Sequence, residues 1–248
     1  MSNNAKQSAG RGLFSPVSLP LRQLEKPAED EVHLWHLDFC RLSNPLSGGE
    51  AGCLDGLSVF QQNTVRRFYL RLLLGAYMGI PGRDVRINRR LKGRPELDAA
   101  QSGGKLDFSV ARSKDSYLVG ISNGATIGVD LEIADRRSGK PLALARRYFS
   151  AAETEALSAL QGEELQRAFM HAWACKEAVV KASGLGIANQ LCRFSVDVNP
   201  EAPPAMLDML DDDPSQWRLA VVRPDSWAIA AVAVRQAELN LRGFRLES

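Results

Sequence analysis

An acidic pair separated by one residue constrains the fold of this 248-residue chain most strongly. Asp130 and Glu132 occur in the stretch Gly-Val-Asp-Leu-Glu, in which Val129 and Leu131 are apolar. Alternate residues of a β-strand point to the same face, so the two acids are expected to project together while the two apolar residues enter the core. The pattern predicts a strand with one apolar and one acidic face.

A segment further along the chain carries a matching helical pattern. Trp173, Glu177 and Lys181 are spaced four residues apart in the stretch Trp-Ala-Cys-Lys-Glu-Ala-Val-Val-Lys, and this spacing places them on one face of an α-helix. If that face meets the acidic strand, three carboxylates and an ammonium group crowd one spot. Two unit charges about 4 Å apart repel by roughly 4 kcal/mol at an effective dielectric constant near 20, so such a cluster is expected to bind a cation. An all-oxygen ligand set favours Mg²⁺, which usually takes further ligands from substrate phosphates.

The composition is that of an ordinary globular protein, with 45% hydrophobic residues, 24% charged residues and a formal net charge of +2. The charge is uneven, because arginine and lysine crowd residues 83–94. This basic segment fits an anionic partner, or equally a solvated strand edge that its charges protect from aggregation. A nucleic-acid-binding protein is a more distant alternative, because the segment lacks interleaved aromatic residues for base stacking. We expect no nucleic-acid partner.

The cysteines and the N-terminus predict a cytoplasmic protein. The cysteines at positions 40, 53, 175 and 192 lack the spacing of a zinc site and are expected to be reduced and mostly buried. Residues 1–30 contain no apolar run, so we expect a flexible leader that is neither a signal peptide nor a membrane span. No membrane association is expected.

Hydrophobic periodicity and turn residues predict strands and helices that come in clusters. Strands are expected over residues 32–39, 84–88, 105–110, 116–122, 126–133, 194–198, 217–222 and 227–234, and helices over 57–78, 142–148 and 163–183, with a further helix capped by Ser150. The three consecutive strands between residues 105 and 133 are expected to form an antiparallel meander. This order predicts an α+β fold with two similar halves, residues 31–125 and 126–248.

The chain resembles the 4′-phosphopantetheinyl transferases. The likeness lies in the acidic motif at residues 128–132, the helical motif at residues 173–181 and Ser-Gly-Leu-Gly at residues 183–186. The likeness is to the larger monomeric type that serves the synthetases of surfactin-like peptides. Three further stretches follow the family's order, namely Arg71-Leu72-Leu73-Leu74, Ile80-Pro81 and Gly93-Arg94-Pro95. Between the two acidic motifs, this chain reads Arg146-Arg147-Tyr148-Phe149-Ser150, with Glu153 after them. This segment is similar to the helix and turn that the family has at the same place.

This resemblance implies a fold and an activity. The fold is a pseudodimer of two α+β halves, with the coenzyme A site in the cleft between them. The activity is an Mg²⁺-dependent transfer of the 4′-phosphopantetheine group from coenzyme A to a serine of an apo acyl or peptidyl carrier protein, which leaves adenosine 3′,5′-bisphosphate. The enzyme is expected to be a monomer.

The resemblance also implies roles for individual residues. Asp130, Glu132 and Glu177 match the magnesium ligands of the family. Lys181 matches the lysine that contacts the phosphates of coenzyme A, and Lys176 matches a further basic residue at the phosphate site. Glu177 is also the candidate that takes the proton from the carrier serine, so the expected catalytic residues are Asp130, Glu177 and Lys181.

Two stretches depart from the family pattern. The usual Phe-Asn-x-Ser-His-Ser reads Phe-Ser-Val-Ala-Arg-Ser over residues 108–113, which puts Ala111 and Arg112 in place of serine and histidine, and Arg94 replaces the lysine of Gly-Lys-Pro. Arginine holds phosphate with two parallel hydrogen bonds, so Arg94 and Arg112, together with Arg71, are expected to bind the coenzyme. The alternative is a non-catalytic relative that binds coenzyme A or a carrier protein as an interaction module.

Overall fold

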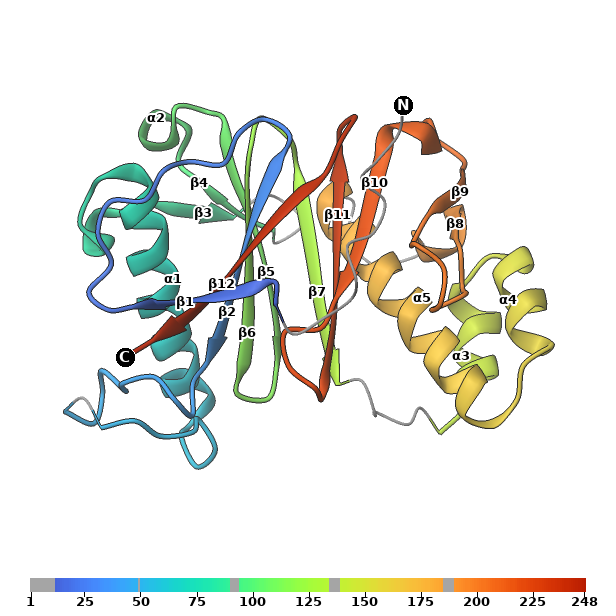
Figure 1. Cartoon of the computed structure of the whole chain (residues 1–248), viewed down its shortest axis with the longest axis horizontal. Coiled ribbons are helices and arrows are strands. Elements are labelled where there is room, and N and C mark those ends of the chain that lie inside the picture. The colour runs from blue at the N-terminus through green and yellow to red at the C-terminus, as the bar shows by residue number, and fades with distance from the viewer. Residues whose placement is uncertain (1–11, 49, 90–93, 134–138, 185–189) are drawn as a thin grey trace.

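The strands form two main sheets, and each sheet packs against one long helix (Figure 1). The computed structural model describes residues 12–48, 50–89, 94–133, 139–184 and 190–248. Helices and mixed sheets alternate in clusters along the chain, so the fold is α+β, as predicted from the sequence. Within the described residues, no helix is both long and apolar enough to cross a bilayer.

The first sheet has five strands in the order β1-β12-β2-β6-β5. Its members are β1 (Phe14–Ser18), β2 (Glu31–Asp38), β5 (Leu106–Ser113), β6 (Ser116–Asn123) and β12 (Asn240–Glu247). β12 pairs in parallel with β1 and β2, whereas β2, β6 and β5 pair antiparallel. The last strand of the sequence thus lies inside the N-terminal sheet. It also pairs with β1, which falls within the segment expected to be a flexible leader.

Helix α1 (Val59–Met78) covers one face of this sheet. It begins at a capping box between Ser58 and Gln61, and it ends at Gly79, whose φ of 67° is the left-handed conformation typical of a helix C-terminus. Four short elements follow it, namely η1 (Gly82–Asp84), β3 (Ile87–Arg89), β4 (Pro95–Leu97) and α2 (Ala99–Ser102). β3 and β4 pair antiparallel as a separate hairpin.

The second sheet is antiparallel and has the order β10-β11-β7. Its strands are β7 (Ile127–Ile133), β10 (Trp217–Val222) and β11 (Ala228–Arg235). Around it lie α3 (Pro141–Tyr148), α4 (Ala151–Ser158), α5 (Gly162–Ser183), η2 (Leu191–Arg193), β8 (Phe194–Val196), β9 (Met206–Met209) and η3 (Pro214–Gln216). The long helix α5 contacts β7 and β11 directly. These contacts place the predicted helical motif over the acidic strand.

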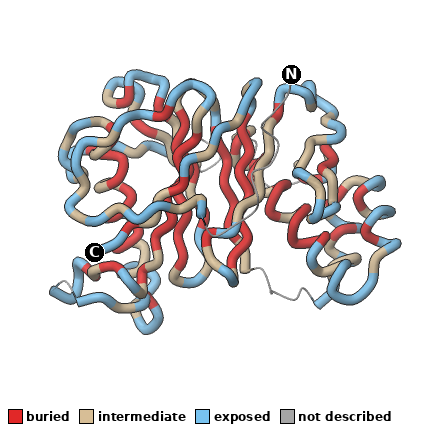
Figure 2. Tube along the Cα trace, in the orientation of Figure 1, coloured by how far each residue is buried: buried red, intermediate tan, exposed pale blue. Residues whose placement is uncertain are grey.

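β7 lies at the junction between the two sheets. It pairs with β11 and not with β6, so the predicted meander of three strands is wrong. On its other side, Asp107 accepts a hydrogen bond from the backbone N–H of Ile127 (3.0 Å), and Ser109 accepts one from that of Val129 (3.1 Å). Side chains of β5 therefore satisfy backbone groups that a neighbouring strand would otherwise satisfy. The strands in the middle of the molecule are almost wholly buried (Figure 2).

Candidate active site

A glycine in β7 allows α5 to approach the sheet closely. A Cβ atom added at Gly128 would overlap the carbonyl oxygen of Ala178 in α5, because the two backbones touch at this point. Residues at alternate positions of a strand share a face, so Asp130 and Glu132 also face α5. Close packing at the glycine thus brings the acidic face of the strand next to the helix.

Asp130 and Lys181 form the contact that joins the two motifs. The Lys181 ammonium donates a 2.6 Å hydrogen bond to Oδ1 of Asp130, and the Asp130 side chain is only 9% exposed. The second oxygen, Oδ2, is buried and has no hydrogen-bond partner within the described residues. A buried carboxylate oxygen without a partner is costly, so this atom is a strong candidate for a metal ligand.

The pKa of Glu177 responds to Asp130, Glu132 and Lys181. Burial, followed by the negative charges of Asp130 and Glu132, raises its pKa from 4.5 to about 7, and the Lys181 ammonium opposes this rise. Such interactions require short separations inside the protein. The structure therefore brings together the three acids and the lysine that the sequence singled out. We call Asp130, Glu132, Glu177 and Lys181 the acid cluster.

The donor chemistry of the acid cluster fits a divalent cation with a preference for oxygen. All three acids offer carboxylate oxygens, which Mg²⁺ prefers, and one of these oxygens lacks a hydrogen-bond partner. The oxygens of these three acids do not all lie within 4.8 Å of one another. Among the described residues, the one group of potential metal ligands that close together is Cys40, Cys53 and Asp115. A cation would therefore draw the three carboxylates closer together.

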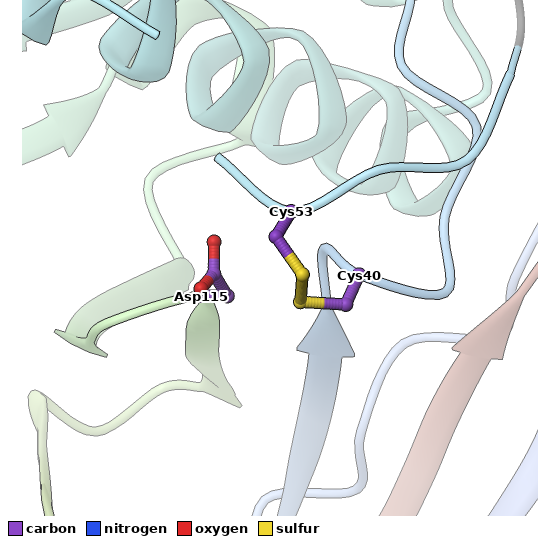
Figure 3. A group of neighbouring side chains, drawn as sticks. All are labelled: Cys40, Cys53 and Asp115. Atoms are coloured by element: carbon purple, nitrogen blue, oxygen red, sulfur yellow. A yellow bond between two sulfur atoms is a disulfide. The ribbon is translucent and has the colours of Figure 1, made fainter. Parts of the chain in front are cut away.

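The group of Cys40, Cys53 and Asp115 is not a metal site (Figure 3). The two cysteines form a disulfide, so they have no thiolate to offer, and the prediction that all four cysteines are reduced is wrong for this pair. The loop between them turns back on itself and brings their Cα atoms to 4.0 Å, which the sequence spacing did not reveal. Asp115 instead accepts a 2.6 Å hydrogen bond from the backbone N–H of Leu54.

Lys176 lies apart from the acid cluster, on a different face of α5. Its side chain is fully buried, and its ammonium donates hydrogen bonds to both carboxylate oxygens of Glu153 (2.8 and 2.7 Å) and to the carbonyl of Phe194 (2.6 Å). These internal contacts occupy the ammonium of Lys176, so its position does not favour the expected contact with a phosphate. The physical reason is helix geometry, because neighbouring residues point about 100° apart and only one of Lys176 and Glu177 can face β7.

Arg94 and Arg71 also bind parts of the protein itself. Arg94 is mostly buried and donates hydrogen bonds to Asp107 (2.5 Å) and to the carbonyl of Ile127 (2.9 Å), so it fixes the start of β7. Arg71 donates a 2.5 Å hydrogen bond to the carbonyl of Val85 and lines a pocket beside η1. Neither arginine contacts the acid cluster in the structure.

Arg112 belongs to a second basic group, at the end of β5. Its guanidinium donates a 3.0 Å hydrogen bond to Asn63 in α1, and its charge, after burial, helps to lower the pKa of the neighbouring Arg66. Within the described residues neither arginine forms an ion pair, and Nε of Arg66 is buried without a hydrogen-bond partner. Two close guanidinium groups that, in the described part of the chain, share only the nearby carboxylate of Asp115, with no direct ion pair, attract an anion such as phosphate.

The chain is similar in sequence to known proteins. A sequence model of the 4′-phosphopantetheinyl transferase superfamily matches residues 126–232, which span both β7 and α5. The 4′-phosphopantetheinyl transferase HetI of Nostoc sp. is 32% identical over 222 residues, which cover 83% of this chain and 88% of HetI. The chain belongs to the 4′-phosphopantetheinyl transferase superfamily. It is a transferase.

Two further relatives are similar over shorter stretches. A protein of Synechocystis sp. with the name putative 4′-phosphopantetheinyl transferase slr0495 is 34% identical to this transferase over 164 residues, which cover 64% of the chain and 63% of the relative. The 4′-phosphopantetheinyl transferase psf-1 of Bacillus pumilus is 28% identical over 134 residues, or 53% of the chain and 54% of psf-1. The match to HetI therefore extends over the largest part of the transferase among these three.

Three residues that position the acid cluster were not predicted from the sequence. Asp107 and Ser109 hold β7 through its backbone, and their spacing by two along β5 is the signal that could have placed them on one face. Glu153 was expected only as part of a helix cap. It also binds Lys176 and the backbone N–H of Val196 (2.8 Å), and so it anchors α5 on the face that points away from the acid cluster.

Proposed function

We propose that this transferase moves the 4′-phosphopantetheine group of coenzyme A to a serine of an apo acyl or peptidyl carrier protein, and that it requires Mg²⁺. The observation that carries the proposal is the meeting of Asp130, Glu132 and Glu177 beside Lys181, from two segments far apart in the sequence. All four residues come from one chain, which supports a monomeric enzyme. We further propose that it works in the cytoplasm.

The acid cluster supplies the ligands that Mg²⁺ needs. Asp130, Glu132 and Glu177 would hold the ion, and the unpartnered Oδ2 of Asp130 is the clearest vacant donor. Bound there, the ion would act as a Lewis acid that neutralises charge on the pyrophosphate of the coenzyme. Phosphoryl transfer depends mainly on positioning and charge neutralisation, so this chemistry matches the reaction.

Basic residues on both sides of β7 would orient the coenzyme. Lys181 uses one of its three N–H donors on Asp130, so the others can contact a phosphate oxygen. Arg112 and Arg66 lie near the end of β5, which runs beside β7, because the side chains of Asp107 and Ser109 accept hydrogen bonds from the backbone of Ile127 and Val129. We propose that this arginine pair holds the 3′-phosphate, in place of the histidine that is usual in the family.

Glu177 is suited to take the proton of the attacking serine. A general base must lie close to the proton that it takes, and Glu177 lies beside Asp130 and Lys181, where the phosphate would bind. In the proposed step, the serine oxygen forms a bond to the phosphorus that carries the pantetheine arm. The bond from this phosphorus to the bridging oxygen breaks, adenosine 3′,5′-bisphosphate leaves, and the serine proton passes to Glu177.

Mass spectrometry of carrier proteins tests this function. The protein is incubated with coenzyme A, Mg²⁺ and apo carriers from fatty-acid, polyketide and peptide synthesis, and each carrier is weighed. We expect at least one carrier to gain the mass of one phosphopantetheine group, and a carrier with its serine replaced by alanine to gain nothing. Binding of coenzyme A without modification of any carrier would support the non-catalytic alternative and reject the proposal.

A further inference from the structure

A polar pocket of about 630 Å³ lies between α1, η1, β3 and α2. Its polar lining side chains are Arg71, Arg83, Asp84, Arg86, Asn88 and Gln101. Helices α1 and α2 lie on one side of β7 along the long axis of the molecule, and α5 lies on the other (Figure 1). The pocket is therefore separate from the acid cluster, and the proposed transferase reaction does not use it.

The lining of this pocket carries an excess of positive charge. Three arginines face a single carboxylate, Asp84, which gives a formal charge of three minus one, or +2. In the described part of the chain Arg71 and Arg86 form no ion pair, and Arg83 meets Asp84 only at 3.9 Å with both side chains exposed. Charges that the protein leaves uncompensated in a concave site attract an anion.

Hydrogen bonds hold the wall of the pocket in place. The side chain of Gln101 accepts a 2.7 Å hydrogen bond from the backbone N–H of Arg86 and donates a 2.8 Å hydrogen bond to the carbonyl of Asp84. Arg71 donates a 2.5 Å hydrogen bond to the carbonyl of Val85, which is buried. The backbone that presents the arginines is thus fixed before any ligand binds, which reduces the entropy lost on binding.

We propose that this pocket binds a small anion with two or more phosphate groups. Guanidinium groups bind phosphate oxygens with paired, charge-assisted hydrogen bonds, and three of them can neutralise more than one phosphate. No aromatic side chain lines the described pocket, so its ligand is a polyphosphate or a sugar phosphate and not a group held by base stacking.

Calorimetric titration with sodium pyrophosphate tests the proposal on the full chain, with EDTA present, without coenzyme A and at constant ionic strength. We expect wild-type protein to bind pyrophosphate, and Arg83→Gln and Arg86→Gln each to raise its Kd about tenfold or more, since each removes charge-assisted hydrogen bonds. Arg89→Gln removes the same charge from the same segment but does not line the pocket, so its Kd should not change. Circular dichroism checks that each variant is folded.

Two variants of the transferase site show where the pyrophosphate binds. Lys181→Ala and Arg112→Gln should keep the wild-type Kd. The proposal is overturned if wild type does not bind, or if these two variants lose binding while Arg86→Gln retains it. It is also overturned if Arg83→Gln and Arg86→Gln raise only the KM for a carrier protein, because the pocket would then be a docking surface for an acidic protein.

Discussion

Lys181 and Asp130 are 51 residues apart in the sequence, yet the lysine ammonium lies 2.6 Å from Oδ1 of the aspartate. This contact joins α5 to β7, and it occupies only one of the two carboxylate oxygens, because Oδ2 has no hydrogen-bond partner within the described residues. The pair thus combines a fixed cation with an oxygen that remains available for a metal. Both features are required if the site is to hold a phosphate and its counterion side by side.

Substitution of Lys181 by alanine should separate catalysis from metal binding. The variant loses the cation that contacts the phosphate, so we expect carrier modification to fall about 100-fold or more. Its affinity for Mn²⁺ should be unchanged or higher, since Asp130 no longer has a competing cation. Rate measurements and Mn²⁺ titration check the two effects, with Lys105→Ala, an exposed lysine, as the control. Loss of Mn²⁺ binding in the Lys181 variant would contradict this division of roles.

Substitution of Glu177 by glutamine should change how stability depends on pH. The raised pKa means that the folded protein keeps the Glu177 proton up to about pH 7, whereas the unfolded chain loses it near pH 4.5. The stability that the protonated form contributes is therefore full below pH 4.5 and is lost as the pH rises through 7. Glutamine cannot ionise, so at pH 8 without metal the variant should be more stable than wild type by about 1 kcal/mol, after allowance for partial exposure.

Denaturant unfolding at pH 5 and pH 8 in EDTA measures this effect. The gain in stability should shrink toward pH 5, and the same variant should be inactive in carrier modification. If the difference in unfolding free energy between Glu177→Gln and wild type is the same at pH 5 and pH 8, the neighbouring acids do not raise the pKa of Glu177.

Substitution of Gly128 by alanine should disturb the acid cluster through the backbone. The added methyl group would overlap the carbonyl oxygen of Ala178, so α5 must move away from β7. We expect a loss of about 1–3 kcal/mol in unfolding free energy, and a loss of activity of about 100-fold, because a shift near 1 Å misplaces Glu177 and Lys181. Gly52→Ala is the matched control, since a Cβ atom there has open space. Wild-type activity in the Gly128 variant would mean that this close approach is not needed.

Substitution of Lys176 by alanine should reduce stability and leave substrate binding intact. It leaves the buried carboxylate of Glu153 without its cation, which costs about 3–5 kcal/mol. Thermal unfolding measures the loss, and Glu153→Ala in a double-mutant cycle should show strong coupling with Lys176→Ala. A contact with phosphate would give the opposite pattern, a raised KM for coenzyme A in a protein of normal stability.

The local elements were largely predictable from the sequence. The capping box at Ser150 and Glu153, the end of α5 at Gly184 and the acidic face of β7 all depend on residues close together in the chain. The convergence of Asp130 with Glu177 and Lys181 was also expected. Hydrophobic periodicity does not show that the strand and the helix meet, but the resemblance to the transferase family implies that they do.

Other features depend on contacts between distant segments, which periodicity does not encode. The pairing of β12 with β1 and β2 joins opposite ends of the chain, and β7 contacts distant segments at Gly128 and at the side chains of Asp107 and Ser109. The burial of Lys176 depends on Glu153, which satisfies its charge from another helix.

A crystal structure with coenzyme A and Mn²⁺ tests the central claim most directly, because the anomalous scattering of manganese locates the ion independently of the protein. We predict one manganese peak at coordination distance from carboxylate oxygens of Asp130, Glu132 and Glu177, with Lys181 beside the pyrophosphate. A manganese ion bound elsewhere, or bound coenzyme A with no manganese between these three carboxylates, would contradict the account.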